Sequence, residues 1–451
     1  MTIPSRVAVG LAVFSSCLYA AQAPSPSQNQ PAPTATVPAP PPPAPGAKKL
    51  TLPEAEQLAL KNNPQIAEGQ FQVRAYQEVT REFRSAYYPT IQGDLTAVGA
   101  DSGSRLAAGA LNNPVIYNRV GMGVVMNELI TDFGRTGSLV QSASLSARAQ
   151  EQALNLTKAD LLLRTDGAYL AVLRTRALRG VAQETVRTRQ DVVDQVTALF
   201  QSKLKSSLDV SFANVNLADA KVLLSDAEND LRSAEAQLAR LLAVPSDTRF
   251  DLAEPPGGSA LPADPGALAQ QALQKRPDLL ERRLEVESAQ QFARAEQMLS
   301  RPTVGLQGAA GYVPTGDAQV PGTYGAVGVN VRLPVFNGGL FRARRFEAQS
   351  RALAAQKGEQ DLELEIQRDV RTAWLNAKNA FEKLDLTQQL LNQAKMALDL
   401  AQARYKLGLS PIVELSQSQL QYTSAELARA RAQYDYVAQL SLLNYQTGLV
   451  P

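Results

Sequence analysis

Two long stretches of the chain show a helical alternation of apolar and polar positions. Neither Ser138–Ser202 nor Leu340–Leu407 contains a proline. At about 1.5 Å per residue, each stretch would form a helix of roughly 100 Å, a length that helices of globular domains rarely approach. The pattern therefore predicts two very long, rod-like helices.

Each long stretch is followed by a second apolar pattern, whose spacings alternate between three and four residues. This alternation is typical of a coiled-coil seam. The first seam comprises Val210, Ala213, Leu217, Ala220, Leu224, Ala227, Leu231, Ala234, Leu238 and Leu241. A shift of 203 positions, from Val210 to Val413, predicts the second seam: Val413, Ser416, Leu420, Thr423, Leu427, Ala430, Tyr434, Val437, Ser441 and Asn444.

These stretches belong to an internal repeat, which decides the whole fold when it is present. The first half opens with Ala59-Leu60-Lys61-Asn62-Asn63-Pro64-Gln65-Ile66, and Ala272-Leu273-Gln274-Lys275-Arg276-Pro277-Asp278-Leu279 opens the second. Farther on, Gly121–Leu129 matches Gly325–Leu333 at an offset near 204. Each half reads as helix, two strands, long helix and helix. We expect the first repeat at 50–243, an equatorial linker at 244–276 and the second repeat at 277–451.

Four segments between the helices have the character of strands. They are rich in Gly, Val and Thr and nearly free of charge: Thr90–Ala100, Arg119–Ile130, Thr303–Tyr312 and Thr323–Leu333. Strands of about 10 residues with one apolar face suit a transmembrane barrel, although an ordinary half-buried sheet has the same pattern. Four strands cannot close a barrel, and open sheet edges are not tolerated in lipid. A membrane location would therefore require several chains to share one barrel.

The N-terminal segment reads as an export signal followed by a linker. Arg6 precedes an apolar stretch, Val7–Phe14, that is too short to anchor a protein in a bilayer. We expect the signal peptide at 1–23. The residues before Cys17 partly resemble a bacterial lipobox. An alternative interpretation is therefore that Cys17 is not discarded with the signal but becomes the acylated N-terminus of the exported protein. Residues 24–49 are rich in proline and alanine, which predicts a disordered linker.

Composition narrows the possible chemistry. The 451 residues include 45 Lys and Arg against 43 Asp and Glu, a net charge of +2, which offers no broad basic face for nucleic acid. There is no histidine, and Cys17 is the single cysteine. The commonest general base and zinc ligand are thus missing, and no intrachain disulfide can form. We predict no enzyme, no cofactor and no metal site, although composition leaves open an enzyme built on carboxylates or lysine.

Several short motifs, in their order and spacing, resemble the TolC-like outer-membrane efflux family from about residue 50 to the end. They are Ala59-Leu60-Lys61-Asn62-Asn63-Pro64, Tyr88-Pro89-Thr90 and Leu443-Asn444-Tyr445-Gln446-Thr447-Gly448. The resemblance implies a mainly α fold with a small β part. Three chains would form a homotrimer with a twelve-stranded β-barrel in the outer membrane and a long α-helical barrel in the periplasm. It further implies a passive exit duct that works with a periplasmic adaptor (membrane fusion) protein and an inner-membrane pump.

The same resemblance places two candidate sites at the periplasmic end. The tip turns, expected to contact the adaptor, comprise Leu204, Lys205, Ser206 and Ser207 in the first half and Leu407, Gly408, Leu409 and Ser410 in the second. In this alignment Lys205 stands where the second turn has Gly408. Acidic residues near this end ring a closed aperture in the family, and the matching positions are Asp209, Glu414 and Gln417. Good turn residues and solvated helix carboxylates would explain the same positions without a function.

Other functions fit parts of the sequence. A type I protein secretion duct would have the same architecture. A secreted structural coiled-coil protein would explain the helices and the signal, but neither the uncharged strands nor the repeat. No motif identifies the cargo, which could be drugs, metal ions, solvents or a secreted protein.

Overall fold

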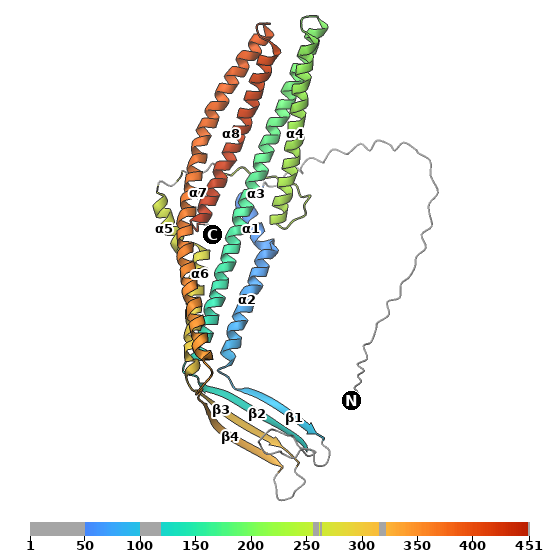
Figure 1. Cartoon of the computed structure of the whole chain (residues 1–451). Helices are drawn as coiled ribbons and strands as arrows, with labels where there is room; N and C mark the ends of the chain where they lie inside the picture. Colours follow the sequence, from blue (N-terminus) through green and yellow to red (C-terminus); the bar gives the residue numbers. More distant parts are fainter. Residues whose placement is uncertain (1–49, 100–118, 256–260, 262–263, 315–321, 450–451) are drawn as a thin grey trace, which may run out of the picture. The chain divides into compact units, whose positions relative to one another are not determined.

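The computed structural model of the protein describes residues 50–99, 119–255, 261, 264–314 and 322–449. The expected signal peptide, the linker and Cys17 lie outside these residues, so those interpretations stay predictions. Within the described part, helices and strands follow one order in both halves of the chain (Figure 1).

The element bounds confirm the mainly α fold and the internal repeat. The first half consists of α1 (Leu52–Asn62), α2 (Pro64–Ser85), β1 (Thr90–Val98), β2 (Arg119–Thr131), α3 (Arg135–Gln201) and α4 (Ser207–Leu241). The second half consists of α5 (Pro265–Lys275), α6 (Pro277–Gln297), the short 3-10 helix η1 (Met298–Ser300), β3 (Thr303–Tyr312), β4 (Thr323–Arg332), α7 (Leu340–Lys406) and α8 (Ile412–Gln446). Helices α3 and α7 have 67 residues each, and α4 and α8 have 35 each.

From the start of α3 to the end of α4, each residue of the first half matches the residue 205 positions later, in α7 or α8. The described residues with positive φ form pairs 205 positions apart: Phe133 with Gly338, Gly134 with Gly339, Lys203 with Gly408, and Ala243 with Gly448. Burial agrees, since Leu161 and Ile366 are both fully buried at equivalent positions of α3 and α7. The offset near 204 expected from the sequence was therefore one residue short.

The buried face of α8 differs from the coiled-coil seam that was predicted for it. Most residues of the expected α4 seam are buried, but Val413 and Leu420 of the expected α8 seam are exposed in the single chain. The buried residues of α8 are Ile412, Leu415, Gln419, Ala425, Ala432, Tyr434, Tyr436, Leu440 and Leu443. A shift of 203 failed because small and large apolar residues recur at many spacings in both helices. A two-residue error still places apolar residues at six of the ten seam positions, although Ser416, Thr423, Ser441 and Asn444 are polar.

The strands form one antiparallel sheet in the order β1-β2-β3-β4. Its register brings apolar side chains together on one face: Ile91, Leu95, Ala97, Val120, Met122, Val124, Met126, Val304, Leu306, Ala310, Val327, Val329 and Val331. The opposite face carries polar residues such as Gln92, Asn127 and Gln307. Much of the apolar face is uncovered in the single chain, where Val327 is 78% exposed.

The helices pack lengthwise around the two long ones. Helix α3 packs against α2 and α4, α7 packs against α6 and α8, and α3 also contacts α6 and α8. In Figure 1 the short helices α2 and α4 follow one another along α3, and α6 and α8 do so along α7. The α3–α4 and α7–α8 turns therefore lie at the end of the helices that is away from the sheet.

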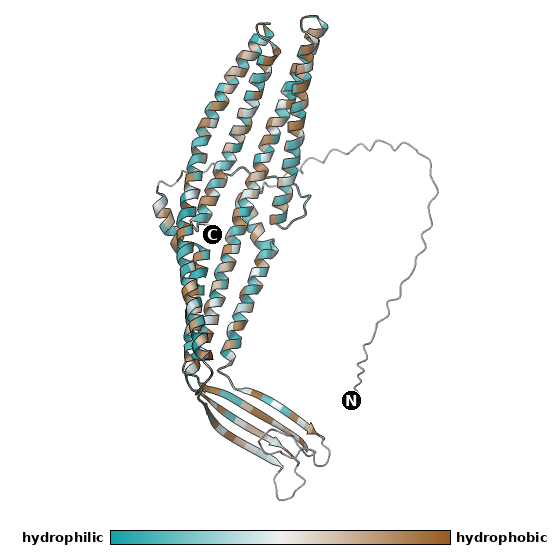
Figure 2. Ribbon diagram, viewed as in Figure 1, coloured by the Kyte–Doolittle hydropathy of each residue, from teal (hydrophilic) through white to brown (hydrophobic). Residues whose placement is uncertain are grey.

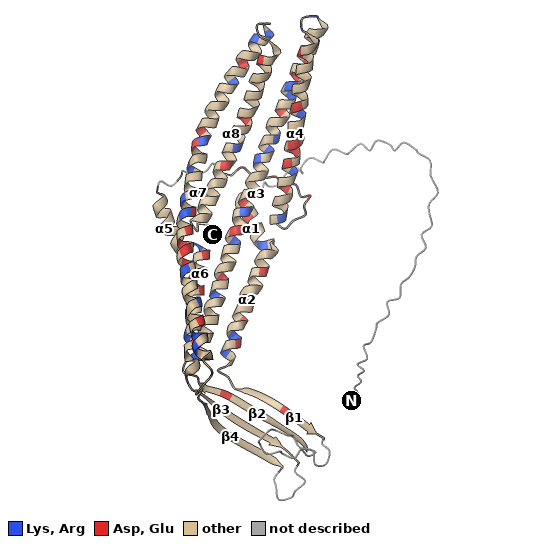
Figure 3. Cartoon of the chain, in the orientation of Figure 1, with Lys and Arg blue, Asp and Glu red and all other residues tan. Residues whose placement is uncertain are grey.

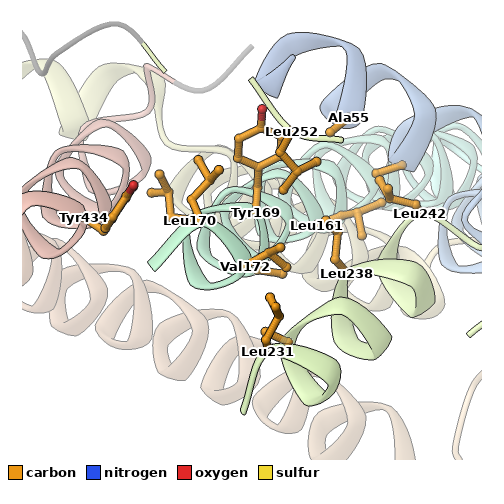
Figure 4. Close-up of a cluster of buried hydrophobic side chains, with 14 of the residues drawn as sticks. Ala55, Leu161, Tyr169, Leu170, Val172, Leu231, Leu238, Leu242, Leu252 and Tyr434 are labelled. Atoms are coloured by element: carbon orange, nitrogen blue, oxygen red, sulfur yellow. The ribbon is translucent and has the colours of Figure 1, made fainter. Parts of the chain in front are cut away.

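The largest core lies midway along the helices, where α1, α3, α4 and α8 meet (Figure 4). Tyr169 of α3 is fully buried there, and its hydroxyl lies 2.7 Å from the carbonyl oxygens of both Leu50 and Ala253. Leu50 also forms an isolated parallel bridge with Leu252. These bonds fasten the segment after α4 to the segment before α1.

Polarity is distributed differently over helices and strands. Along the helices hydrophilic and hydrophobic residues alternate (Figure 2), and charged residues are spread over the helices but sparse on the strands (Figure 3). None of the described helices has an apolar stretch long enough to cross a membrane.

Candidate functional site

The two tip turns follow the same backbone path. Helices α3 and α7 each end before a residue in the left-handed conformation, Lys203 (φ 61°) and Gly408 (φ 75°). The amide of Leu204 then donates to the carbonyl five residues earlier at 2.9 Å, and the amide of Leu409 does the same at 2.8 Å. This pattern is the Schellman ending of a helix, which favours glycine at the left-handed position.

The alignment of Lys205 with Gly408 was wrong. The offset of 205 places Lys203 opposite Gly408 and Lys205 opposite Ser410. The error arose because the shift of 203 taken from the seam was carried into the turn. Lysine at a left-handed position gives no signal in the sequence that could have corrected it.

Four leucines at the tips are exposed. Leu204 and Leu208 of the first turn are 70% and 64% exposed, and Leu407 and Leu409 of the second are 74% and 67% exposed. Isolated apolar residues on a surface are ordinary, but several at one end of a molecule indicate a contact surface. Ser207, the first residue of α4, is exposed beside them. Ser410 instead is buried, and its hydroxyl has no hydrogen-bond partner among the described residues.

A lysine of one turn contacts the helix that ends at the other. The Lys205 ammonium lies 4.3 Å from the centre of the Tyr405 ring, within the range of a cation–π interaction. Tyr405 is buried against Ile412 and Leu415 of α8 and Val196 of α3. Burial, and then the charge of Asp209, raise the pKa of the Tyr405 hydroxyl. Tyr405 thus connects the α3–α4 hairpin with the α7–α8 hairpin. The sequence analysis did not single out this residue. The available signal was an aromatic residue three positions before the turn glycine.

Asp209 closes a capping box at the start of α4. Its carboxylate accepts hydrogen bonds from the Ser206 backbone amide at 2.9 Å and the Ser206 hydroxyl at 2.8 Å, and that hydroxyl caps the Asp209 amide. Desolvation acts to raise the pKa of Asp209, but the Ser206 hydrogen bonds and the charge of Lys205 outweigh it, so the pKa is lowered. Capping accounts for Ser206 and Asp209 within a single chain.

Glu414 occupies the equivalent position of α8 but has a different partner. Arg404 Nε lies 3.0 Å from its carboxylate across the turn. Gln417 is exposed one helical turn farther on. In the described residues no hydrogen bond or ion pair joins Asp209, Glu414 and Gln417 to one another, so one chain alone does not assemble these three into a site.

Comparison with known proteins identifies the class to which this architecture belongs. The family described as "Outer membrane efflux protein" matches residues 56–244 and 268–448. These two stretches make up most of the chain, and the chain belongs to the outer membrane efflux protein family.

Relatives and solved structures agree with this assignment. The outer membrane efflux protein BepC of Brucella suis biovar 1 (strain 1330) is 25% identical over 403 residues, which cover 87% of this chain and 84% of that protein. The outer membrane protein TolC of Escherichia coli (strain K12) is 23% identical over 415 residues, covering 88% and 82%. The outer-membrane channel OprN shares the fold with a TM-score of 0.78 at 20% identity, covering 88% of this chain and 89% of that one. VceC from Vibrio cholerae does so with a TM-score of 0.76 at 18% identity, covering 88% and 96%.

The family assignment settles the broad class. The protein is an outer-membrane efflux channel component, located in the outer membrane with a helical periplasmic part, and its family is one of channels rather than of enzymes. The resemblance stated from the short motifs is confirmed. The alternative of a secreted structural coiled-coil protein does not agree with this family assignment.

Proposed function

We propose that the chain is one subunit of a homotrimeric, passive exit duct of a tripartite efflux pump. In this proposal an inner-membrane pump delivers substrate through a periplasmic adaptor protein, and the duct conducts it across the outer membrane. The duct itself performs no chemistry. Membership of an efflux family supports transport, and the geometry of the single chain supports the rest of the proposal in three ways.

The sheet supports assembly. Among the described strands, β1 and β4 each have one edge without a partner, and such edges are not stable in lipid. If β4 of one chain pairs with β1 of the next, three chains of four strands give a closed barrel of twelve. The face of the sheet that is apolar except for Glu128, opposite Leu306, then meets lipid, and the small, polar face lines the lumen, as in other outer-membrane barrels.

The tips support an adaptor contact, and the exposed leucines carry this part of the proposal. Leu204 and Leu409 stand at equivalent positions of the two turns, so a trimer presents six such leucines at its periplasmic end. Apolar side chains held on a rigid turn are suited to fill pockets of a partner. Lys205, Ser206, Ser207, Leu407, Gly408 and Ser410 complete the proposed adaptor-contact turns.

The acidic residues support a constriction. Threefold symmetry would bring three copies of Asp209 and three of Glu414 toward the axis, where like charges repel and attract cations. The lowered pKa of Asp209 keeps its carboxylate charged at periplasmic pH. Gln417, one helical turn farther along α8 than Glu414, would be an uncharged part of the same opening.

A complementation experiment tests the proposal. A strain that lacks the protein is profiled with toxic compounds of several classes, and resistance is restored with the full chain. Leu409→Asp should fail to restore resistance although the protein reaches the outer membrane in normal amount. Ser202→Asp, which adds the same charge at the exposed C-cap of α3, outside the proposed contact turns, is the control and should restore resistance. Full resistance with Leu409→Asp would reject the tip contact, and no compound sensitivity together with loss of a secreted protein would favour a type I secretion duct.

A further inference from the structure

A hollow at the base of α7 carries arginines that have no counterpart in the first half. The segment Phe341-Arg342-Ala343-Arg344-Arg345-Phe346 lies in the first turns of α7, where the first repeat has Thr136-Gly137-Ser138-Leu139-Val140-Gln141. Since the two helices are equivalent, the fold alone does not require charge here. A function of these arginines would therefore be particular to the second half.

The three arginines differ in their partners. Arg344 donates one hydrogen bond to the Glu296 carboxylate at 3.1 Å and forms an ion pair with it at 2.8 Å. The Glu296 side chain is almost fully buried, at 2% exposure. Arg344 thus neutralises a buried acid. Arg342 and Arg345 are exposed, and neither has an ion-pair partner within the part of the chain that the structure describes.

Arg342 and Arg345 line a common hollow of about 320 Å³. Its other lining residues are Glu296 and Gln297 of α6, Ser300 at the end of η1, and Phe341 and Phe346. The Arg342 guanidinium lies 5.7 Å from the centre of the Phe346 ring, and Phe346 is itself half exposed. Arg344 neutralises the Glu296 carboxylate of this hollow. Two guanidinium groups without an ion-pair partner among the described residues, together with a hydroxyl and two aromatic rings, then match a phosphate group that is joined to apolar chains.

The depth of the hollow fits a lipid headgroup. The apolar face of the sheet continues to Val331, and beyond the sheet Val335 and Phe336 are each 89% exposed. Arg342 and Arg345 are the third and sixth residues of α7, about 3–8 Å along the helix from its first residue. The polar headgroup layer on each side of a bilayer is roughly 5–8 Å thick. If the hydrocarbon layer ends at the first residue of α7, the two arginines lie within the headgroup layer.

We propose that Arg342 and Arg345 bind the phosphate of a phospholipid in the periplasmic leaflet of the outer membrane, with Phe341 and Phe346 against its glycerol and upper acyl chains. The outer-membrane location follows from the family, while the assignment to the periplasmic leaflet rests on the orientation in the proposed function. Three chains would hold at least three such lipids at the junction of sheet and helices, where they would seal the channel wall against the membrane.

Native mass spectrometry of the purified, delipidated full-length protein tests this, with phosphatidylglycerol added to the detergent micelles. Arg342→Gln/Arg345→Gln should bind phosphatidylglycerol about 30-fold more weakly than the unchanged protein, the factor expected for two basic residues at a membrane surface. Arg342→Lys/Arg345→Lys should keep most of the affinity. Arg351→Gln is the matched control, because Arg351 is exposed on the same helix but paired with Glu347 at 2.7 Å, and it should change binding less than twofold.

Other outcomes would overturn the proposal. Equal phosphatidylglycerol binding by the Gln/Gln variant and the unchanged protein would show that the hollow is not a lipid site. Displacement of the lipid by soluble glycerophosphate at equal concentration would show a site for free phosphates. Unchanged lipid binding with altered passage of anionic compounds would place the arginines in the lumen. None of these readouts depends on an adaptor or pump, so failure here leaves the proposed efflux function standing.

Discussion

The two tip turns share a backbone but not a chemistry. In the first, Lys203 takes the left-handed position and Ser206 with Asp209 caps the next helix. In the second, Gly408 takes that position, and the N-cap of α8 is Pro411, which makes no side-chain capping bond. The two halves thus share the backbone conformation of the turn but differ in the side chains that stabilise it. Side chains that differ between the halves are the ones to test for function.

The largest effect should come from the cores of the two halves. Leu161 and Ile366 are equivalent and fully buried, but Leu161 belongs to the larger core at the middle of the helices. Truncation of either side chain leaves a cavity. In the smaller cluster around Ile366 the neighbouring residues can move to fill part of it. We expect Leu161→Ala to lower the free energy of unfolding by about 4 kcal/mol and Ile366→Ala by about 2–3 kcal/mol, measured by denaturant unfolding in detergent. Equal losses would mean that the two cores are equally rigid.

The next difference should appear with pH. Burial first, and then the neighbouring Glu56 carboxylate, raise the pKa of Asp166 in α3 to about 7, while a hydrogen bond with Ser441 partly opposes this. The equivalent residue of α7 is Arg371, which is exposed. A carboxyl whose pKa is raised on folding contributes stability that is complete below its unfolded value near 4 and is lost as the pH rises through about 7.

Thermal unfolding between pH 5 and pH 8 checks this sign. The unchanged protein should be more stable at the lower pH within this range, and Asp166→Asn should flatten the dependence and stabilise the protein at pH 8. Glu382→Gln, which alters an exposed carboxylate on α7, should leave the slope unchanged. A slope that survives Asp166→Asn would assign the dependence to other groups.

The left-handed positions should give a smaller and local effect. Gly408→Ala should destabilise the second turn by about 1–2 kcal/mol, because a Cβ is unfavourable at positive φ, and Lys203→Gly should stabilise the first by up to about 1 kcal/mol. Hydrogen exchange at the amides of Leu204 and Leu409 reports each turn separately. Slower exchange in Gly408→Ala would contradict the equivalence of the turns.

The smallest effect should come from the contact between the hairpins. Lys205→Met removes the charge over the Tyr405 ring and should cost at most about 1 kcal/mol. It should speed exchange at the end of α7. Lys406→Met, at an exposed neighbouring lysine, is the control, and a similar change in both variants would mean that the contact does not hold the hairpins together.

Sequence patterns predicted the elements far better than their pairing. The long helices and all four strands were predicted because proline, glycine and apolar spacing act locally, as Pro64 and Pro277 do at the first turns of α2 and α6. The register between the halves was misplaced because it depends on which face of α8 is buried. Tyr405 and its contact with Lys205 were missed because the contact depends on two hairpins meeting. The local signal, an aromatic residue three positions before Gly408, does not indicate which residue it contacts. The tip leucines were found only through resemblance.

The most direct test of the trimeric duct is disulfide cross-linking between the edge strands. Cys17 is the only natural cysteine, so cysteines can be introduced at Gln92 of β1 and, in separate variants, at Ala326, Gly328 or Asn330 of β4. The pair Asn127 and Gln307, which face each other within one chain, is the control and should link no chains together. In outer membranes, oxidation of at least one β1–β4 pair should give a covalent species of three chains and none larger. Single chains only, or an open ladder beyond three, would contradict a closed trimer.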